Sequence, residues 1–214
     1  RGLVGSEMCI RDSHYAVPHA TSAYLARKIV SRKKKLPVIT TLHGTDITLV
    51  GIDPSYYDIT RFSIEKSDAV TAVSRYLKNQ TLSHFPIEKD IEVIPNFIDP
   101  ERFKPGTPAC RECFAQPDEK ILMHISNFRP VKRIPDIIEV FDGVNRHVKA
   151  LLMMVGSGPE QERARNLIEE KGLSDRVHFL GKQDDVSHLL QLADVYLLLS
   201  EHESFGLTAL EAMS

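Results

Sequence analysis

The chain has 214 residues, a length that accommodates one large α/β domain or two small ones. Hydrophobic residues make up 42% of the chain and charged residues 26%, proportions that are ordinary for a soluble globular protein. The formal net charge of −2 gives no global basic field, so nucleic acid and anionic membrane surfaces are not predicted partners. No apolar run approaches the about 18–20 residues that a membrane-spanning helix needs, so we predict no stable membrane insertion.

Three cysteines are too few for a scaffold built on disulfides. Cys110 and Cys113 form a C-x-x-C pattern, but neither a second cysteine pair nor a His-x-x-x-His pattern accompanies them. We therefore interpret them as incidental thiols in a reducing cytosol, and a metal or redox role is the weaker alternative. The N-terminal stretch has no apolar core of the length that a signal peptide requires, so we expect a cytoplasmic protein.

Both ends of the chain differ from its patterned interior. Residues 1–13 contain no initiator methionine and no clear periodicity, whereas a well-patterned sequence begins at His14. We interpret residues 1–13 as a non-native leader and leave them out of the predicted fold. The helix-like run 206–214 stops without a cap, so we expect both domains to be truncated in this chain.

From His14 onward, helical stretches alternate with short apolar runs. An amphipathic helix is predicted over residues 21–35, where the basic run 32–35 complements the negative end of the helix dipole. The predicted strands are residues 38–42, 69–73 and 91–94, and further helices are residues 55–67 and 74–85, the latter with Ser74 as its cap. This alternation is typical of a parallel sheet with crossover helices.

A change in composition follows, because residues 95–117 contain five prolines and no sustained apolar pattern. We interpret this segment as the interdomain connection and predict one domain over residues 14–105 and another over residues 106–214. In the second domain the predicted strands are 121–125, 150–155, 177–180 and 195–199, and the predicted helices are 130–147, 160–171 and 186–193. The strands are continuous apolar runs, as in a sheet with helices on both faces. The predicted fold class is α/β, with two Rossmann-like domains.

Ligands bind such sheets beyond the carboxyl ends of their strands. The first strand of the second domain leads to Arg129 and Lys132 at the mouth of a helix, where cations beside free N–H groups suit an anionic phosphate. Taken alone, this segment fits a solvated basic loop better than a ligand site. The next strand leads to Gly156 and Gly158, which allow a tight turn and close approach of a ligand, although a G-x-G pattern alone usually marks a turn.

The last two strand ends complete this set. Residues 177–180 lead to the turn residues Gly181 and Lys182. Residues 195–199 lead to Glu203, which we expect to precede a helix that contains Glu211 more than one turn from its start. The N–H groups expected to face a bound diphosphate at this helix start belong to Ser204, Phe205, Gly206 and Leu207. There is no Asp-x-Asp pattern, and we interpret Asp184-Asp185 as a helix cap rather than a metal site.

The pattern Glu203-x7-Glu211 with Phe205-Gly206 resembles the E-x7-E element of the retaining family 4 glycosyltransferases, which have the GT-B fold. Arg129 and Lys132 resemble the donor-phosphate pair of that family, and residues 155–159 resemble its V-G-x-G-P turn. In the first half, Ser74 and the run I-P-N-F-I-D over residues 94–99 match further family elements, except that Phe97 stands in place of the commoner glycine. The resemblance covers nearly all of residues 14–214 and implies a donor site in the second domain and an acceptor site in the first.

The resemblance also implies roles for these residues. Arg129 and Lys132 would neutralise the charge that grows on the diphosphate leaving group, and Glu203 would orient hydroxyls of the transferred sugar. Glu211 would accept hydrogen bonds from ribose hydroxyls, and the backbone of Gly181 and Lys182 would contact the base. A UDP-sugar is the implied co-substrate, and neither a metal nor another cofactor is required.

The runs H-Y-A-V-P-H-A (14–20) and T-T-L-H-G-T-D (40–46) narrow the resemblance to members that transfer N-acetylglucosamine from UDP to the hydroxyl of L-malate, the first step of bacillithiol biosynthesis. Malate is a small dicarboxylate, so its site needs cations and hydroxyl donors. His43 follows a strand and is predicted to be catalytic, near the donor sugar in the interdomain cleft. His14 and His19 are interpreted as structural. The predicted acceptor-binding residues are Tyr15, Thr41, Thr45 and Arg61.

No separate carboxylate base is evident near His43, so the resemblance implies a front-face transfer in which the departing phosphate oxygen takes the proton of the acceptor hydroxyl. Two alternatives stay open at this point. One is a family member with a lipid or polysaccharide acceptor, and the other is an inactive nucleotide-binding or dimerising fragment. The sequence also leaves a homodimer open.

Overall fold

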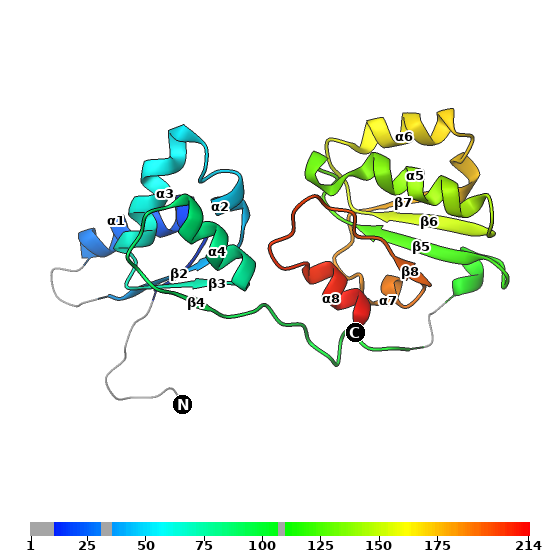
Figure 1. Cartoon of the computed structure of the whole chain (residues 1–214). Coiled ribbons are helices and arrows are strands. Elements are labelled where there is room, and N and C mark those ends of the chain that lie inside the picture. The colour runs from blue at the N-terminus through cyan, green and yellow to red at the C-terminus, as the bar shows by residue number, and fades with distance from the viewer. Residues whose placement is uncertain (1–10, 31–35, 107–109) are drawn as a thin grey trace. The chain divides into compact units, whose positions relative to one another are not determined.

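Two four-stranded parallel sheets organise the chain (Figure 1). The computed structural model describes residues 11–30, 36–106 and 110–214, and the chain divides into the units Arg1–Asn96 and Phe97–Ser214. Each unit combines its sheet with crossover helices, which confirms the prediction of an α/β chain with two Rossmann-like domains. Among the described residues, no helix combines the length and the apolar character needed to cross a membrane.

The sheet of the first unit has the order β1-β2-β3-β4. Its strands are β1 (Arg11–His14), β2 (Val38–Leu42), β3 (Ala69–Ala72) and β4 (Ile91–Val93). β1 pairs in parallel with β2 from Arg11 opposite Val38 to His14 opposite Thr41. The interpretation of residues 1–13 as a leader outside the fold is therefore wrong for residues 11–13, because their backbone pairs with β2. Residues 1–10 lie outside the described part of the chain.

The helices of the first unit follow the predicted order. They are η1 (Ala16–Ala20), α1 (Thr21–Val30), α2 (Thr45–Thr48), α3 (Pro54–Lys66) and α4 (Arg75–His84). Ser74 caps α4 as predicted, because its hydroxyl oxygen accepts a hydrogen bond from the Leu77 N–H at 3.1 Å. Residues 31–35, the end of the predicted first helix, lie outside the described residues. The short elements η1 and α2 were not predicted, because single turns leave no periodic pattern in the sequence.

The sheet of the second unit has the order β7-β6-β5-β8. Its strands are β5 (Lys120–Ile125), β6 (Ala150–Val155), β7 (Val177–Gly181) and β8 (Val195–Tyr196). The chain moves outward from β5 to β7 and then returns to the other side of β5 with β8. This reversal places a topological switch point between β5 and β8, where the carboxyl ends of the strands leave a crevice for a ligand.

Apolar layers cover both faces of this sheet, as the continuous apolar strands predicted. Leu122, Leu152 and Met154 pack under α5 (Ile134–Asn145) and α6 (Gln161–Glu170) on one face. Ile121, Met123 and Met153 pack with residues of α7 (Ser187–Leu190) on the other (Figure 1). The remaining elements of this unit are η2 (Arg111–Cys113), η3 (Pro130–Lys132), η4 (Ser174–Arg176) and α8 (Leu207–Met213).

The boundary between the units falls after Asn96, which is earlier than the predicted boundary after residue 105. The segment that begins at Phe97 joins the second unit because side chains of that unit bind its backbone. The Ser214 hydroxyl donates to the Phe103 carbonyl at 2.8 Å, and the Gln191 amide donates to the Lys104 carbonyl at 3.2 Å. Pro100 and Pro105 of this connection therefore belong to the second unit.

Cys110 and Cys113 form a disulfide. The Cys113 N–H donates to the Cys110 carbonyl at 3.0 Å, and a turn of this kind brings side chains three residues apart to the same side. The structure therefore contradicts the interpretation of the two residues as incidental thiols in a reducing cytosol. Expectations about the cellular compartment supported it, whereas the local backbone geometry favours the pairing.

Candidate functional site

An ion pair joins two distant segments at the carboxyl edge of the second sheet. The Lys132 ammonium group, at the end of η3, contacts the carboxylate of Glu203, which lies between β8 and α8. The two side chains are 21% and 27% exposed. The Glu201 N–H also donates to the Val131 carbonyl at 2.9 Å, so a backbone bond reinforces the contact. The structure thus brings together two residues predicted to serve the donor site.

Arg129 belongs to the same turn as Lys132. It occupies the N-cap position of η3, and its carbonyl accepts a hydrogen bond from the Lys132 N–H at 2.8 Å. Its side chain is exposed. One cation of the turn therefore contacts Glu203, and the other faces solvent at the same sheet edge.

Close backbone contacts within the protein explain why residues 156 and 158 are glycines. Gly156 has a φ of +115°, and a Cβ atom built on it would lie 1.9 Å from the Ser126 carbonyl oxygen. A Cβ atom on Gly158 would lie equally close, at 1.9 Å, to the Asn127 carbonyl oxygen. The close approach at these glycines is therefore that of the turn after β5, and their contact with a donor stays a prediction.

Gly181 lies beside this turn. It ends β7 with a φ of +66°, and its carbonyl accepts a hydrogen bond from the Gly156 N–H at 2.7 Å. Lys182 follows with an exposed side chain. Three predicted segments, after β5, β6 and β7, therefore meet at one edge of the sheet, as parallel strands require.

The segment after β8 has the predicted layout. Gly206 occupies the N-cap position of α8 with a φ of +80°, Glu203 precedes the helix, and Glu211 lies more than one turn inside it. Ser204 and Phe205 lie between Glu203 and Gly206 and are half-buried, and Leu207 begins the helix. The part that their N–H groups play in donor binding stays a prediction.

Glu211 lies near Arg102, a residue that the sequence did not mark. Burial raises the pKa of the Glu211 carboxyl group, and the Arg102 charge opposes this shift. Arg102 also pairs with Asp185 at 3.2 Å. Asp185 directly precedes Val186, the N-cap residue of α7, and accepts from the Ser187 N–H at 2.9 Å, so it lies one residue before the cap position that the sequence predicted. Hydrogen bonds from Ser187 and then Arg102 lower its pKa to about 2. Arg102 escaped notice because the proline-rich segment around it shows no periodic pattern.

Glu211 also borders a pocket of about 200 Å³ in the second unit. Its walls come from the segment after Asn96 and from α7 and α8. The lining residues are Phe103, Lys104, Pro105, Ser187, Leu190, Gln191, Glu211, Ala212, Met213 and Ser214.

His124 is a buried polar residue of this edge that the sequence reading missed. It lies in β5 with no exposed surface, and its Nδ1 atom is 2.9 Å from the Leu197 carbonyl oxygen. Its Nε2 atom is 2.7 Å from the Ser126 hydroxyl oxygen. Burial lowers the pKa of His124 to about 4, so the ring is neutral at pH 7. A histidine inside an apolar run was the available signal.

The lowered pKa of His124 predicts how the stability of the second unit depends on pH. The folded-state pKa lies below the unfolded value, so the unfolded chain binds the proton more tightly, and stability falls as pH drops below about 6.5. Between pH 7 and pH 5 we expect His124 to cost the second unit about 2 kcal/mol of unfolding free energy. Urea denaturation followed by circular dichroism measures this change. The variant His124→Gln should show a shallower loss, and a loss equal to that of the wild type would contradict the prediction.

In the first unit, His43 lies at the carboxyl edge of β2 beside His14 and Tyr15. The His14 Nδ1 and His43 Nε2 atoms are 2.8 Å apart, and the Tyr15 and His43 rings have centroids 5.1 Å apart. Burial lowers the pKa of His43, the neighbouring His14 lowers it further, and Asp46 opposes the shift. His43 is therefore predominantly neutral at pH 7. His19 contacts the His14 carbonyl oxygen at 2.7 Å.

Asp46 organises this edge and was also missed. Its side chain is 2% exposed, and its Oδ2 atom accepts from the Ala16 N–H at 2.9 Å. Its Oδ1 atom accepts from the N–H groups of Gly44 at 2.9 Å and His43 at 3.3 Å. The carboxylate therefore fixes the backbone around His43 and ties it to η1.

Three of the four predicted acceptor residues lie along this edge. The Tyr15 N–H donates to the Thr41 carbonyl at 2.9 Å, and Thr45 begins α2. The Thr41 hydroxyl accepts a hydrogen bond from Thr71 at 2.9 Å. Arg61, on α3, pairs instead with Glu65 at 3.2 Å. Arg61 also borders a pocket lined by Glu65, Pro86, Glu88 and Lys89. The acceptor roles of all four residues stay predictions.

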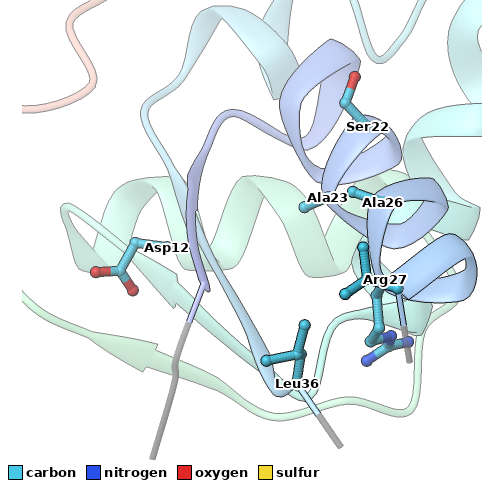
Figure 2. Close-up of a pocket in the computed structure, with 7 residues that line it drawn as sticks. Asp12, Ser22, Ala23, Ala26, Arg27 and Leu36 are labelled. Atoms are coloured by element: carbon cyan, nitrogen blue, oxygen red, sulfur yellow. The ribbon is translucent and has the colours of Figure 1, made fainter. Parts of the chain in front are cut away.

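A further pocket of about 320 Å³ lies beside α1 (Figure 2). It is lined by Asp12, Ser22, Ala23, Ala26, Arg27, Val30 and Leu36. None of these residues is a predicted site residue, and Arg27 is engaged by Asp68 at 2.6 Å. Within the described ranges, no group of three or more histidine, cysteine, aspartate or glutamate side chains is arranged to hold a metal ion. The independence from metal stays a prediction.

Comparisons with known proteins match both units to glycosyltransferases. The family model "Glycosyltransferase Family 4" matches residues 9–102, and "Glycosyl transferases group 1" matches residues 111–214. The N-acetyl-alpha-D-glucosaminyl L-malate synthase of Bacillus anthracis is 48% identical over 94% of this chain and 53% of its own length. An uncharacterized glycosyltransferase of Methanocaldococcus jannaschii is 28% identical over 84% of this chain and 50% of its own length. The chain thus spans about half the length of these relatives.

Solved structures show the same fold. The Anabaena protein HepE, in complex with UDP and glucose, matches with a TM-score of 0.78 at 20% identity, over 91% of this chain and 54% of that one. Sucrose-phosphate synthase from Thermosynechococcus elongatus matches with a TM-score of 0.77 at 20% identity, over 95% of this chain and 53% of that one. With both halves matched by glycosyltransferase families and the motifs at the expected strand ends, the chain belongs to the family 4 glycosyltransferases.

Proposed function

We propose that the whole protein carrying this sequence is a retaining transferase that moves N-acetylglucosamine from UDP-N-acetylglucosamine to the hydroxyl of L-malate. The observation that carries this proposal is the meeting of Lys132, Arg129 and Glu203 at the switch point of the second sheet. The Bacillus anthracis relative, an N-acetyl-alpha-D-glucosaminyl L-malate synthase, supports the choice of sugar and acceptor.

The donor diphosphate binds at the carboxyl edge of the second sheet. Arg129 and Lys132 neutralise the charge that develops on the departing phosphate, and fixed charges of this kind are the largest single term in many enzymes. Glu203 holds Lys132 in place and orients hydroxyls of the sugar, and Glu211 accepts hydrogen bonds from the ribose. No step in this scheme requires a metal ion.

The acceptor binds at the edge that carries His43. Tyr15, Thr41 and Thr45 lie along this edge and supply hydroxyl groups for a small dicarboxylate. Arg61 supplies a cation from α3, in exchange for its pairing with Glu65. In the transfer, the bond from the anomeric carbon to the phosphate oxygen breaks and a bond to the malate hydroxyl oxygen forms.

The proton of the malate hydroxyl passes to the departing phosphate oxygen, which leaves as UDP. Asp46 is the carboxylate in contact with the His43 backbone, but it is buried and its oxygens accept three backbone N–H bonds. It is therefore unsuited to serve as the base, which supports proton transfer to the leaving group.

The test uses the whole protein with UDP-N-acetylglucosamine. We expect UDP release to depend on L-malate, to persist in EDTA and to give an α-linked product by NMR. UDP release that ignores malate, or that follows a lipid or polysaccharide acceptor instead, would refute the acceptor assignment. If UDP does not raise the thermal stability of this chain, the donor assignment fails.

A further inference from the structure

The His124 side chain connects two segments of the donor edge that are far apart in the sequence. Its Nδ1 atom contacts the Leu197 carbonyl oxygen, just after β8, at 2.9 Å. Its Nε2 atom contacts the Ser126 hydroxyl, just after β5, at 2.7 Å. The ring is fully buried, so water does not compete for either contact.

These partners fix the position of the proton on the ring. A carbonyl oxygen only accepts, so Nδ1 carries the hydrogen, and Nε2 of the neutral ring accepts from the Ser126 hydroxyl. The Ser126 hydroxyl oxygen in turn accepts from the Phe128 N–H at 3.2 Å. The three hydrogen bonds run in one direction, so each polarises the next.

Both ends of this relay, the three hydrogen bonds that run from Phe128 through Ser126 and His124 to Leu197, lead to groups of the donor site. Phe128, which has a φ of 39° and a ring stacked near His124, directly precedes Arg129. Leu197 leads to Glu203. β8 pairs with β5 through Val195 and Tyr196, and the Leu197 N–H donates to Met123 at 2.8 Å. Beyond that bond, the His124 ring connects the two segments through its hydrogen bond to the Leu197 carbonyl.

We propose that His124 is a positioning residue of the donor site, whose neutral ring holds the turn after β5 and the segment after β8 in the register that lets Arg129, Lys132 and Glu203 grip a diphosphate. This inference rests on the proposed donor site. His124 itself is fully buried and acts through its bonds to Leu197 and Ser126.

The test measures UDP affinity by calorimetry and the melting temperature of this chain for four variants. His124→Phe removes both ring contacts, and Ser126→Ala breaks the relay without altering the core. We expect each to weaken UDP binding about tenfold, the loss of roughly one hydrogen bond to a positioned group. His124→Gln keeps one donor and one acceptor and should recover most of the affinity. His178→Phe, on β7 of the same sheet, is the matched control and should bind UDP as the wild type does.

Each outcome decides the proposal. If His124→Phe and Ser126→Ala bind UDP as tightly as the wild type, the positioning role is refuted. If His124→Phe fails to fold, Ser126→Ala gives the answer alone. If the wild-type chain does not bind UDP, the donor assignment fails, and amide hydrogen exchange then tests the relay by itself. Lower protection of the Phe128 and Glu201 amides in Ser126→Ala supports it, and unchanged protection overturns it.

Discussion

Replacing Lys132 by methionine is expected to lower kcat of the whole protein by about 100- to 1000-fold, the usual cost of removing a group that stabilises developing charge. The same change should weaken UDP binding to this chain by about tenfold or more, because a charge-assisted hydrogen bond contributes roughly 1.5–3 kcal/mol. Methionine keeps the length and apolar stem of lysine. The fold should therefore persist, because neither Lys132 nor Glu203 belongs to the apolar core of the unit and Glu203 keeps access to solvent.

Lys149→Met is the matched control for this experiment. Lys149 directly precedes β6 and so lies at the opposite edge of the same sheet, where it pairs with Asp118 at 2.6 Å. Calorimetry with UDP and steady-state kinetics with the UDP-sugar compare the two variants. Equal UDP affinities for Lys132→Met and Lys149→Met would show that the diphosphate does not bind at Lys132.

Replacing Gly156 by alanine is expected to destabilise the second unit by about 3 kcal/mol or more. The added Cβ atom would lie 1.9 Å from the Ser126 carbonyl oxygen, and Gly156 has a φ of +115°, a conformation that alanine rarely adopts. The Ser126 backbone cannot move aside easily, because its N–H donates to the Val155 carbonyl at 3.0 Å. Urea denaturation measures the loss.

Gly143→Ala provides the control in the same unit. Gly143 lies within α5, and a Cβ atom on it would meet nothing within 4 Å. Alanine there should stabilise the unit by about 0.5–1 kcal/mol, because it favours the helix over glycine. A Gly156→Ala variant as stable as the wild type would show that the two loops do not pack as the structure describes.

The sequence predicted strands well where apolar runs are bounded by turns and caps. β2 matches residues 38–42 because a β-branched run ends at a glycine turn, and α4 begins after Ser74 because the serine hydroxyl satisfies a free N–H group. The strand predicted over residues 195–199 was too long, since β8 ends at Tyr196. Leu197 and Leu199 pack against the core, but Leu197 keeps only one backbone bond to β5, through Met123, and neither residue extends the strand. An apolar pattern reports burial rather than backbone pairing.

Residues of the site were predictable where their spacing is local. The position of Glu203 before a helix and Glu211 within it follows from helical geometry along one segment. His124 and Asp46 were missed because their partners are distant, Leu197 being 73 residues from His124 and Ala16 being 30 residues from Asp46. Periodicity in one sequence carries no information about such contacts, and both residues occupy positions where an apolar or turn residue would fit the local pattern.

The two-residue pairing of β8 has a consequence for the local stability of the donor site. Beyond Tyr196, this short ladder is supplemented by the hydrogen bonds of Leu197 with Met123 and His124 and by that of Glu201 with Val131. Local opening of these bonds while β5, β6 and β7 stay folded would release the loop that carries Glu203. A nucleotide bound to both the turn after β5 and the loop after β8 would hold these two segments together. On heating, the donor site would then open locally before the rest of the unit unfolds, and bound substrate would raise the temperature at which it opens.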